Sequence, residues 1–370
     1  MHVVLLLAAT VSAAPSATAA AAPSTAHIAG TVVAQRSHWE GGLIVTESRV
    51  RTESGEELTV RELGGAVDGI AQVAFGEDTL GAGVGARVDV SLVREGATWF
   101  VAPSGEHAHA AKAEAPATTP TYVRATTSIS GNCPAAKAVD LHWGGDEVHY
   151  VLDAHPPEGV TAADAEAAVN ASFASWASIG CSYLKLGYDG QVEGAQVGYS
   201  ATSSNENLVT YVDHDWHGKS STQAVTLLTF GCADGTILDA DVVVNAQDFH
   251  FTTHPGEDQE RRRDLQNVLT HEAGHFVGFA HSPDPLSTMF ATVTADETQK
   301  RDLTDSDSKG MCVAYPVDNN PLDVLVVDPS ACSVAVGGAG GATSRGALGL
   351  ALLAIFAGVG LKSRARRSNR

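Results

Sequence analysis

Apolar residues recur along the chain with helical spacing in two segments. Residues 161–177 carry apolar side chains at every third or fourth position, which predicts a helix with one buried face. Thr161 is the expected N-cap of this helix, with Asp164 three residues later. Residues 263–279 repeat the pattern, so we expect a second core helix there. Short runs of β-branched and apolar residues predict strands at 148–152, 182–186, 208–212, 224–230 and 236–245.

The N-terminal part of the chain has only the strand pattern. Apolar runs separated by glycines predict strands at 28–33, 43–50, 58–63, 72–75 and 86–93. Short strands at regular spacing indicate a small all-β domain, a barrel or a sandwich, over residues 27–104. The Ala-, Pro- and Thr-rich residues 105–122 follow as a linker. We find no catalytic chemistry in this domain, and three roles stay open for it: inhibitory prodomain, folding chaperone or binding module.

Both ends of the chain carry apolar segments outside these domains. Residues 1–22 combine a short apolar run with Ala- and Ser-rich sequence, which is typical of a secretory signal peptide. Residues 346–361 are apolar and uncharged, and the basic tail 362–370 follows them directly. This order is typical of a stop-transfer helix, although the segment is slightly short for a full span. We therefore expect an exported protein with transient or permanent membrane contact through residues 346–361.

The composition agrees with export and argues against one class of partner. The 43 acidic and 23 basic residues give a formal net charge of −20, which opposes binding to nucleic acid and favours solubility outside the cell. In an exported protein, four cysteines in the central part of the chain suggest two disulfides with three possible pairings. These four are Cys133, Cys181, Cys232 and Cys312. Cys332 lies apart, in the Gly/Ala-rich spacer 319–345.

The candidate chemistry lies in the segment His-Glu-Ala-Gly-His-Phe-Val-Gly-Phe-Ala-His, residues 271–281. On a helix, His271 and His275 lie on one face, where two imidazoles can take two corners of a tetrahedral zinc site. Gly278 can adopt positive φ and reverse the chain, so that His281 meets the same metal. Three protein ligands leave a fourth position for a water whose pKa zinc lowers to about 7.

The same segment resembles the signature of a known clan of proteases. Its spacing, H-E-x-x-H-x-x-G-x-x-H, is similar to that of the metzincin zinc endopeptidases. Ser282 follows the third histidine, Met289 lies where a Met-turn would run, and Ala291 stands where other branches carry a tyrosine ligand, so the segment resembles the matrixin branch. The resemblance implies a zinc-dependent endopeptidase. Glu272 is the expected general base, which takes a proton from water and passes it to the leaving amine.

The resemblance extends over residues 123–318, about half of the chain. The end of this segment resembles the last helix of matrixin catalytic domains, with four residues in step: Leu303, Asp307, Gly310 and Tyr315. It implies an α+β catalytic domain with a twisted mixed sheet and three helices. Residues 224–230 resemble the edge strand of the cleft, to which a protein or peptide substrate would add as an extended strand. The alternative is a surface binding protein with a zinc-stabilised, catalytically silent metzincin scaffold.

Two further polar clusters could bind metal. Residues 213–217 have the residue types of the second, structural zinc of matrixins, but the fuller ligand set is missing, so a solvated loop is favoured. Asp239, Asp241 and Asn245 alternate on the expected strand 236–245 and offer oxygen ligands to Ca²⁺, without the rest of a coordination shell. Calcium is therefore the less supported of the two expected cofactors.

The resemblances also bear on the cysteines. Cys332, the apolar segment and the arginine cluster after it together resemble the MYXO-CTERM sorting signal of myxobacterial surface proteins. That likeness implies a sorting protease that cuts near Cys332, and a retained single-pass anchor is the alternative. In matrixin-like folds the regions of Cys133 and Cys312 are neighbours, which favours the pairs Cys133–Cys312 and Cys181–Cys232. The Pro-Arg-Cys-Gly latency motif of matrixins is missing, so if the enzyme is held inactive, something else must cover the zinc, and the candidate is the N-terminal domain.

Overall fold

The computed structural model describes residues 24–319, apart from residues 78, 96–97, 103–120, 130–132, 134–136, 204, 215, 217 and 257–261. The expected signal peptide, most of the linker and everything from residue 320 on therefore lie outside the described residues. These include Cys332, the apolar segment 346–361 and the basic tail 362–370. Within the described part, no helix is both long and apolar enough to cross a membrane.

The N-terminal region, residues 24–102, consists of strands. They are β1 (Ser24–Glu40), β2 (Leu43–Thr52), β3 (Glu57–Val67), β4 (Ile70–Phe75), β5 (Arg87–Glu95) and β6 (Thr98–Val101). The pairings β1–β2, β2–β3, β3–β6, β6–β5 and β5–β1 close five strands into a ring. Its core is apolar: Ile28, Val32, Val50, Val60, Leu80, Val88, Leu92 and Val101. All five expected strands are present, and only the four-residue β6 was too short to predict.

The rest of the described chain, residues 121–319, is the α+β region. Its sheet contains β8 (His142–Trp143), β9 (Glu147–Asp153), β10 (Lys185–Val192), β11 (Leu208–Val212), β12 (Ala224–Gly231) and β13 (Thr236–Asn245). The strand order is β10-β9-β11-β13-β12. All of these neighbours are parallel except β12, which is antiparallel to β13. The sheet is therefore mixed, as the α+β prediction requires.

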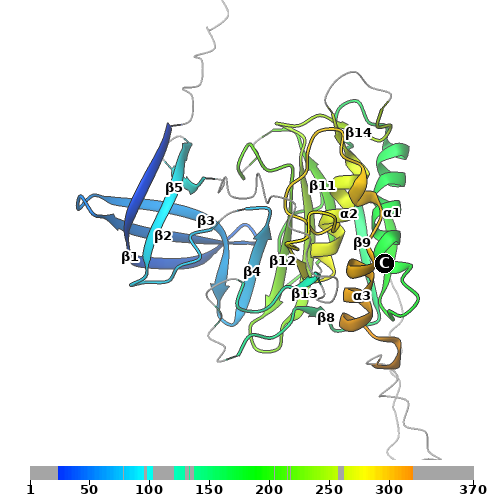
Figure 1. The fold of residues 1–370 in the computed structure, drawn as a ribbon, viewed down its shortest axis with the longest axis horizontal. Coiled ribbons are helices and arrows are strands. Elements are labelled where there is room, and N and C mark those ends of the chain that lie inside the picture. The colour runs from blue at the N-terminus through cyan, green and yellow to red at the C-terminus, as the bar shows by residue number, and fades with distance from the viewer. Residues whose placement is uncertain are drawn as a thin grey trace, which may run out of the picture. The chain divides into compact units, whose positions relative to one another are not determined.

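Three α-helices occur in the described residues (Figure 1). They are α1 (Ala162–Ala177), α2 (Leu265–Phe276) and α3 (Asp305–Ala314). Helices α1 and α2 pack against each other, and α2 also contacts β12 and β13. The predicted cap of α1 is confirmed, because the Thr161 side chain accepts a hydrogen bond from the Asp164 amide. Large buried side chains fill the space between the helices and the sheet: Phe173, Trp176, Phe230, Phe276, Phe279 and Tyr315.

Short elements connect these parts. They are β7 (Val123–Arg124), β14 (Phe251–Thr252), β15 (Arg263–Asp264), β16 (Phe279–Ala280), the 3-10 helix η2 (Gln299–Arg301) and η3 (Val317–Asn319). Helix α2 is shorter than the predicted 263–279 for local reasons. The Asp264 carboxylate caps its first turn by accepting from the Asn267 amide, and Gly278 ends it in a left-handed conformation.

Two sequence predictions in this region were wrong. The disulfides are Cys133–Cys232 and Cys181–Cys312, with Cα atoms 5.3 and 5.1 Å apart. The predicted pairs were Cys133–Cys312 and Cys181–Cys232. The Cys181–Cys312 bond and the bridge between Ser182 and Pro316 hold residues 181–184 at the end of α3. Strand β10 consequently begins at Lys185 and runs to Val192, beyond the predicted 182–186.

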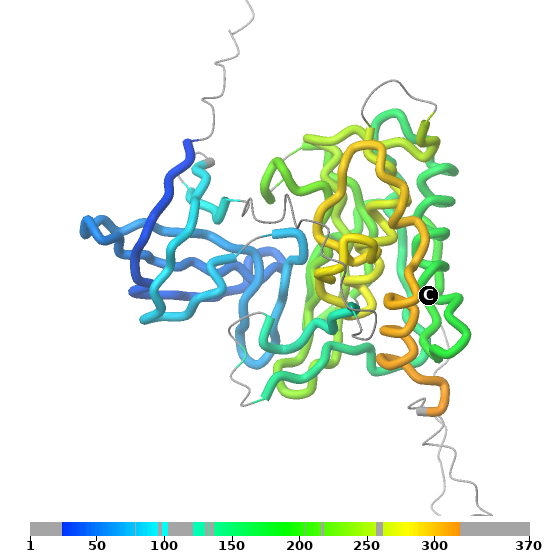
Figure 2. The backbone as a smooth tube through the Cα atoms, in the orientation of Figure 1, coloured from blue at the N-terminus to red at the C-terminus, as the bar shows by residue number. Residues whose placement is uncertain are grey.

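Strand β12 is not a free edge in the full chain. Its outer side pairs antiparallel with β4, from Thr226 opposite Phe75 to Gly231 opposite Ile70. Strand β4 also pairs with β3, so β1–β6 and β8–β13 form one continuous sheet of twelve strands (Figures 1 and 2). The sequence of residues 224–230 could not indicate this partner, because a strand pattern shows burial and not which strand pairs with it.

Candidate metal centre

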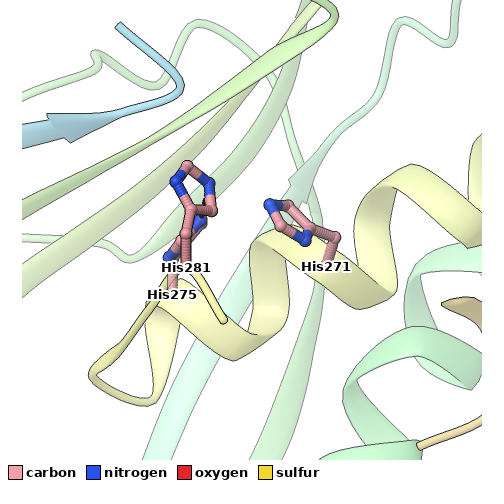
Figure 3. A group of neighbouring side chains, drawn as sticks. All are labelled: His271, His275 and His281. Atoms are coloured by element: carbon pink, nitrogen blue, oxygen red, sulfur yellow. Dashed lines mark hydrogen bonds between the residues drawn. The ribbon is translucent and has the colours of Figure 1, made fainter. Parts of the chain in front are cut away.

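Helix α2 presents the first two histidines of the motif. His271 and His275 are four residues apart and buried, and both rings lie on the side of α2 where His281 returns (Figure 3). The start of α2 is fixed by Asp264, which caps the helix and also accepts a hydrogen bond of 2.8 Å from Arg301 Nε. The helix that carries the ligands is therefore anchored two turns before His271.

Gly278 turns the chain so that His281 comes back to the helix. Its φ of 89° lies in the left-handed region, as predicted, and its amide donates to the His275 carbonyl. A Cβ at this position would lie 2.7 Å from the Leu141 carbonyl oxygen, so a larger residue would not fit. Strand β16 follows directly, and His281 comes immediately after it.

The three imidazoles converge on one point. Their ligand nitrogens lie within 4.8 Å of one another, and His275 Nε2 is 3.2 Å from His281 Nε2. On the opposite side of two rings, His271 Nδ1 lies 2.7 Å from the Thr288 carbonyl and His275 Nδ1 lies 2.7 Å from the Phe279 carbonyl. A carbonyl accepts from an N–H, so Nδ1 carries the proton and the Nε2 lone pairs are directed at the shared point.

Burial keeps these rings uncharged. It lowers the pKa of His271 and of His275 well below the usual histidine range, with neighbouring imidazoles and the Lys300 ammonium acting in the same direction. A neutral imidazole with a free Nε2 lone pair is the form that ligates zinc. Among the described residues, one group of three or more His, Cys, Asp or Glu side chains is close enough together to hold a metal ion. This group is His271, His275 and His281. The donor set therefore fits the expected zinc.

Glu272 lies beside the histidines in a buried position. Burial raises its pKa to about 7, against the effect of a hydrogen bond of 2.6 Å that the Thr226 hydroxyl donates to Glu272 Oε2. Thr226 is on β12, so this bond joins the strand to α2. The sequence predicted the strand but not this contact, since an apolar run with two threonines carries no sign of which hydroxyl faces a helix.

The expected Met-turn lies against α2. Gly274 leaves room for Met289 there, because a Cβ on Gly274 would come within 2.6 Å of Trp176 and still closer to the Met289 sulfur. The Ser282 amide donates to the Met289 carbonyl at 2.8 Å, which ties the turn to the third histidine. The buried Asp307 of α3 accepts bonds from both residues that precede Met289, Ser287 and Thr288.

Lys300 is a second residue that the motif did not indicate. Its side chain is 1% exposed, and its ammonium donates to the Phe290 and Thr292 carbonyls. Its backbone amide donates to Asn267 Oδ1 on α2 at 2.7 Å. Burial lowers the pKa of Lys300 to about 8. Lys300 thus links the segment after the Met-turn to the helix that carries the ligands.

Phe75 contacts the centre from the N-terminal region. Its ring stacks on the His275 imidazole, with centroids 4.2 Å apart and planes inclined by 8°. Two hundred residues separate Phe75 from His275 in the sequence, and only the pairing of β4 with β12 brings them together. No local signal in the sequence could therefore have placed Phe75 in the site.

The other two polar clusters do not join this centre. Asp239 and Asp241 are buried on β13, and Asp241 accepts hydrogen bonds from two backbone amides. Asn245 instead donates to the Thr222 carbonyl and the Asp248 carboxylate. Calcium binding at these residues therefore stays a prediction. In the cluster 213–217, Asp213 and His214 are exposed and contact each other, and Asp215 and His217 lie outside the described residues.

Comparison with known proteins gives one family. Residues 142–316 match the family model described as Matrixin. Among solved structures, the chain is similar to metalloproteinase-II from Bacteroides fragilis, at 11% identity and a TM-score of 0.28, over 77% of this chain and 92% of that one. Comparison with curated proteins finds no match. The segment that matches the Matrixin model contains the three histidines and the Met-turn.

Proposed function

We propose that the protein is a zinc-dependent endopeptidase that hydrolyses peptide bonds outside the cell. The observation that carries this proposal is the meeting of three imidazoles, within 4.8 Å, beside the buried carboxyl of Glu272. A binding scaffold would need the three histidines alone. The glutamate and its hydrogen bond from Thr226 support turnover instead.

Each residue has a chemical role in this proposal. His271, His275 and His281 would hold zinc, which when bound polarises the scissile carbonyl and makes water more acidic. Glu272 accepts a proton at its carboxylate from the attacking water and then delivers it to the leaving amine. The Thr226 hydroxyl holds Glu272 Oε2 at 2.6 Å and so fixes the direction in which the carboxyl presents its second oxygen.

The substrate in this proposal is an extended peptide segment. Strand β12 runs beside α2, and its Thr226 contacts Glu272, so a peptide paired with the outer side of β12 would lie next to the histidines. The matrixin match supports peptides as the class of substrate.

Export and surface sorting are also part of the proposal. The apolar run in residues 1–22 supports secretion, and residues 332–370 support a sorting signal or an anchor at the other end. The two disulfides of the α+β region are typical of proteins that fold in an oxidising compartment.

The activity assay compares three chains on casein and on a quenched peptide library. Each is measured as the full chain and after cleavage between residues 103 and 120. Glu272→Gln should lower kcat/KM by about 10²- to 10⁴-fold, because it removes the general base while keeping the shape of the side chain. The exposed Glu193→Gln is the matched control and should behave as the wild type. A zinc chelator should abolish the activity, and added zinc should restore it.

Two outcomes would contradict this function. Full activity of Glu272→Gln would remove the proposed base, and activity that persists in the chelator would remove the metal. A wild-type chain that binds zinc but cleaves nothing in either form would favour the silent surface scaffold.

A further inference from the structure

The outer edge of β12 is already occupied by a segment of the chain itself. Six consecutive residues of β4 pair antiparallel with β12, from Ile70 opposite Gly231 to Phe75 opposite Thr226. The other edge of β12 pairs with β13. A strand has only two edges for backbone hydrogen bonds, so a peptide substrate and β4 cannot pair with β12 at the same time.

Phe75 brings β4 into direct contact with the metal centre. Its ring stacks on His275 at 4.2 Å, and the residue is only 5% exposed. Its Cα lies opposite Thr226, whose hydroxyl donates to Glu272. Strand β4 therefore ends beside both a proposed ligand and the proposed base, where a peptide bond would have to lie to be cleaved.

Polar contacts secure β4 in this position. Gln72 Nε2 donates to the Thr229 hydroxyl at 3.0 Å, and Gln72 Oε1 accepts from the Ile44 amide at 2.9 Å. Just after β4, the Glu77 carboxylate accepts from the Lys219 amide and lies 4.0 Å from the Lys219 ammonium. The side chains of this ion pair are only 9% and 5% exposed, and separating a buried pair is costly.

We propose that β4 is an internal competitor for the substrate strand, which keeps the full chain latent until the N-terminal region is removed by proteolysis. This inference rests on the proposed function, because it assigns the peptide substrate to the same edge of β12. The chain has no cysteine before Cys133, so a thiolate from the N-terminal region cannot cover the metal.

The side chains of β4 also indicate the class of peptide that this edge accepts. Ala71, Val73 and Phe75 alternate along β4 and pack with the core that contains α2. Ala74 points to the opposite face, where it packs with a separate apolar cluster. An extended peptide with apolar side chains at alternate positions, and an aromatic one next to the metal, would make the same contacts. We assign this pattern to the substrate.

The chain that follows the linker stays attached to the α+β region. The backbone amides of Thr121 and Tyr122 donate to the Ser306 hydroxyl on α3 at 3.0 and 3.1 Å. Strand β7 then pairs with β16, next to the third histidine. A cut between residues 103 and 120 would therefore separate β1–β6 from the α+β region and leave residues 121 onward held in place.

The test uses the full, zinc-loaded chain with a site for a sequence-specific protease inserted between residues 103 and 120. The uncut chain should hydrolyse a quenched peptide library slowly at every protein concentration. Cutting makes the contact of β4 intermolecular, so dilution to nanomolar concentration should release the N-terminal region and raise kcat/KM at least about 100-fold. Equal, measurable rates for the cut and uncut chains would overturn the proposal.

Hydrogen–deuterium exchange provides a readout that does not depend on catalysis. The β12 amides that point toward β4 should be protected in the uncut chain and should exchange at least about tenfold faster in the diluted, cut chain. Amides of β11, which pairs with β9 and β13 and not with β4, should not change. Faster exchange in β12 without hydrolysis would support the position of β4 and count against the proposed function. Unchanged protection after release of the N-terminal region would overturn the proposal.

A single substitution tests the contact at the metal centre. Phe75→Ala should raise kcat/KM of the uncut chain at least about tenfold, because the loss of a buried ring weakens the docking of β4. Trp99→Ala removes an aromatic side chain of β6 that packs against the core of the N-terminal region, and it should leave the uncut chain latent. Exchange of the β11 amides shows that each variant is folded. An uncut Phe75→Ala chain with the wild-type rate and wild-type β12 protection would overturn the proposal.

Discussion

The bond from Thr226 to Glu272 Oε2 fixes the orientation of one carboxyl group in the site. Its 2.6 Å length and full burial mark it as a strong contact to a group that must carry charge as a base. We expect Thr226→Val, which keeps the shape of the side chain, to lower kcat/KM of the cut chain by about 10- to 100-fold. Steady-state hydrolysis of a quenched peptide measures this effect.

A matched variant separates this role from packing. Thr210→Val removes a hydroxyl that donates to Asp153 on a neighbouring strand of the same sheet, away from the histidines. It should leave kcat/KM unchanged. A similar loss in both variants would mean that hydroxyl removal harms the sheet and not the orientation of Glu272.

Lys300 is the second informative single residue, because its buried ammonium holds two carbonyls after the Met-turn. Lys300→Met fills the same space but leaves those carbonyls without their donor. We expect the free energy of unfolding to fall by about 1–3 kcal/mol, measured by urea denaturation. The exposed Lys309→Met should stay within about 0.5 kcal/mol of the wild type, and an equal loss in both variants would contradict the role of Lys300.

Among the elements, β13 carries a buried acidic pair with a direct effect on stability. Burial, and for Asp239 also the Asp241 charge, raises the pKa of both carboxyls above the unfolded value. The folded chain therefore binds protons more tightly than the unfolded chain. The stability that these groups contribute is complete at low pH and is lost as pH rises through their folded pKa values.

Because these carboxyls make the folded chain less stable as pH rises, Asp239→Asn should reduce this pH dependence. Between pH 5 and pH 9, the free energy of unfolding of the wild type should fall by at least about 1.4 kcal/mol more than that of the variant. This difference is the equivalent of one pKa unit. Thermal unfolding of both chains at several pH values, without divalent cations, measures the difference. Parallel pH profiles would contradict it. A rise of the midpoint on adding Ca²⁺ in the wild type alone would support the calcium prediction at β13.

The connection between α1, α3 and the sheet depends on the two disulfides. Mass spectrometry of an unreduced digest should recover Cys133 joined to Cys232 and Cys181 joined to Cys312. Replacing Cys181 and Cys312 together by serine should cost about 2–5 kcal/mol, because the bond closes a loop of 131 residues. Peptides that join Cys133 to Cys312 would contradict this arrangement.

At the scale of the whole molecule, the sequence predicted those features that depend on interactions between residues close together in the chain. The N-cap Thr161, the left-handed Gly278 and the strands β11 and β13 follow from spacing and residue type, and the histidines follow from helix geometry. Pairing between distant segments was not predictable in the same way. The cysteine partners depend on where β10 and α3 meet in space, and a pattern of apolar residues does not contain that information.

The pairing of β4 with β12 is the main example of a contact between distant segments that the sequence did not predict. Residues 72–75 were predicted as a strand of a separate N-terminal domain, and nothing in their sequence distinguishes pairing with β3 from pairing with β12. The pairing with β12 connects the N-terminal region to the candidate metal centre, because it places the Phe75 ring on His275. A residue of the N-terminal region thereby lies against one histidine of the candidate metal centre.

The zinc content of the protein tests most directly whether the three histidines form one zinc site beside a catalytic glutamate. Dialysed protein is analysed for metal by mass spectrometry, as wild type, Glu272→Gln and His281→Ala. We predict about one zinc ion per chain in the first two, because Glu272 is not a ligand. His281→Ala should retain less than about a tenth of that amount. A wild type without zinc, or a His281→Ala chain that keeps its full complement, would contradict the account.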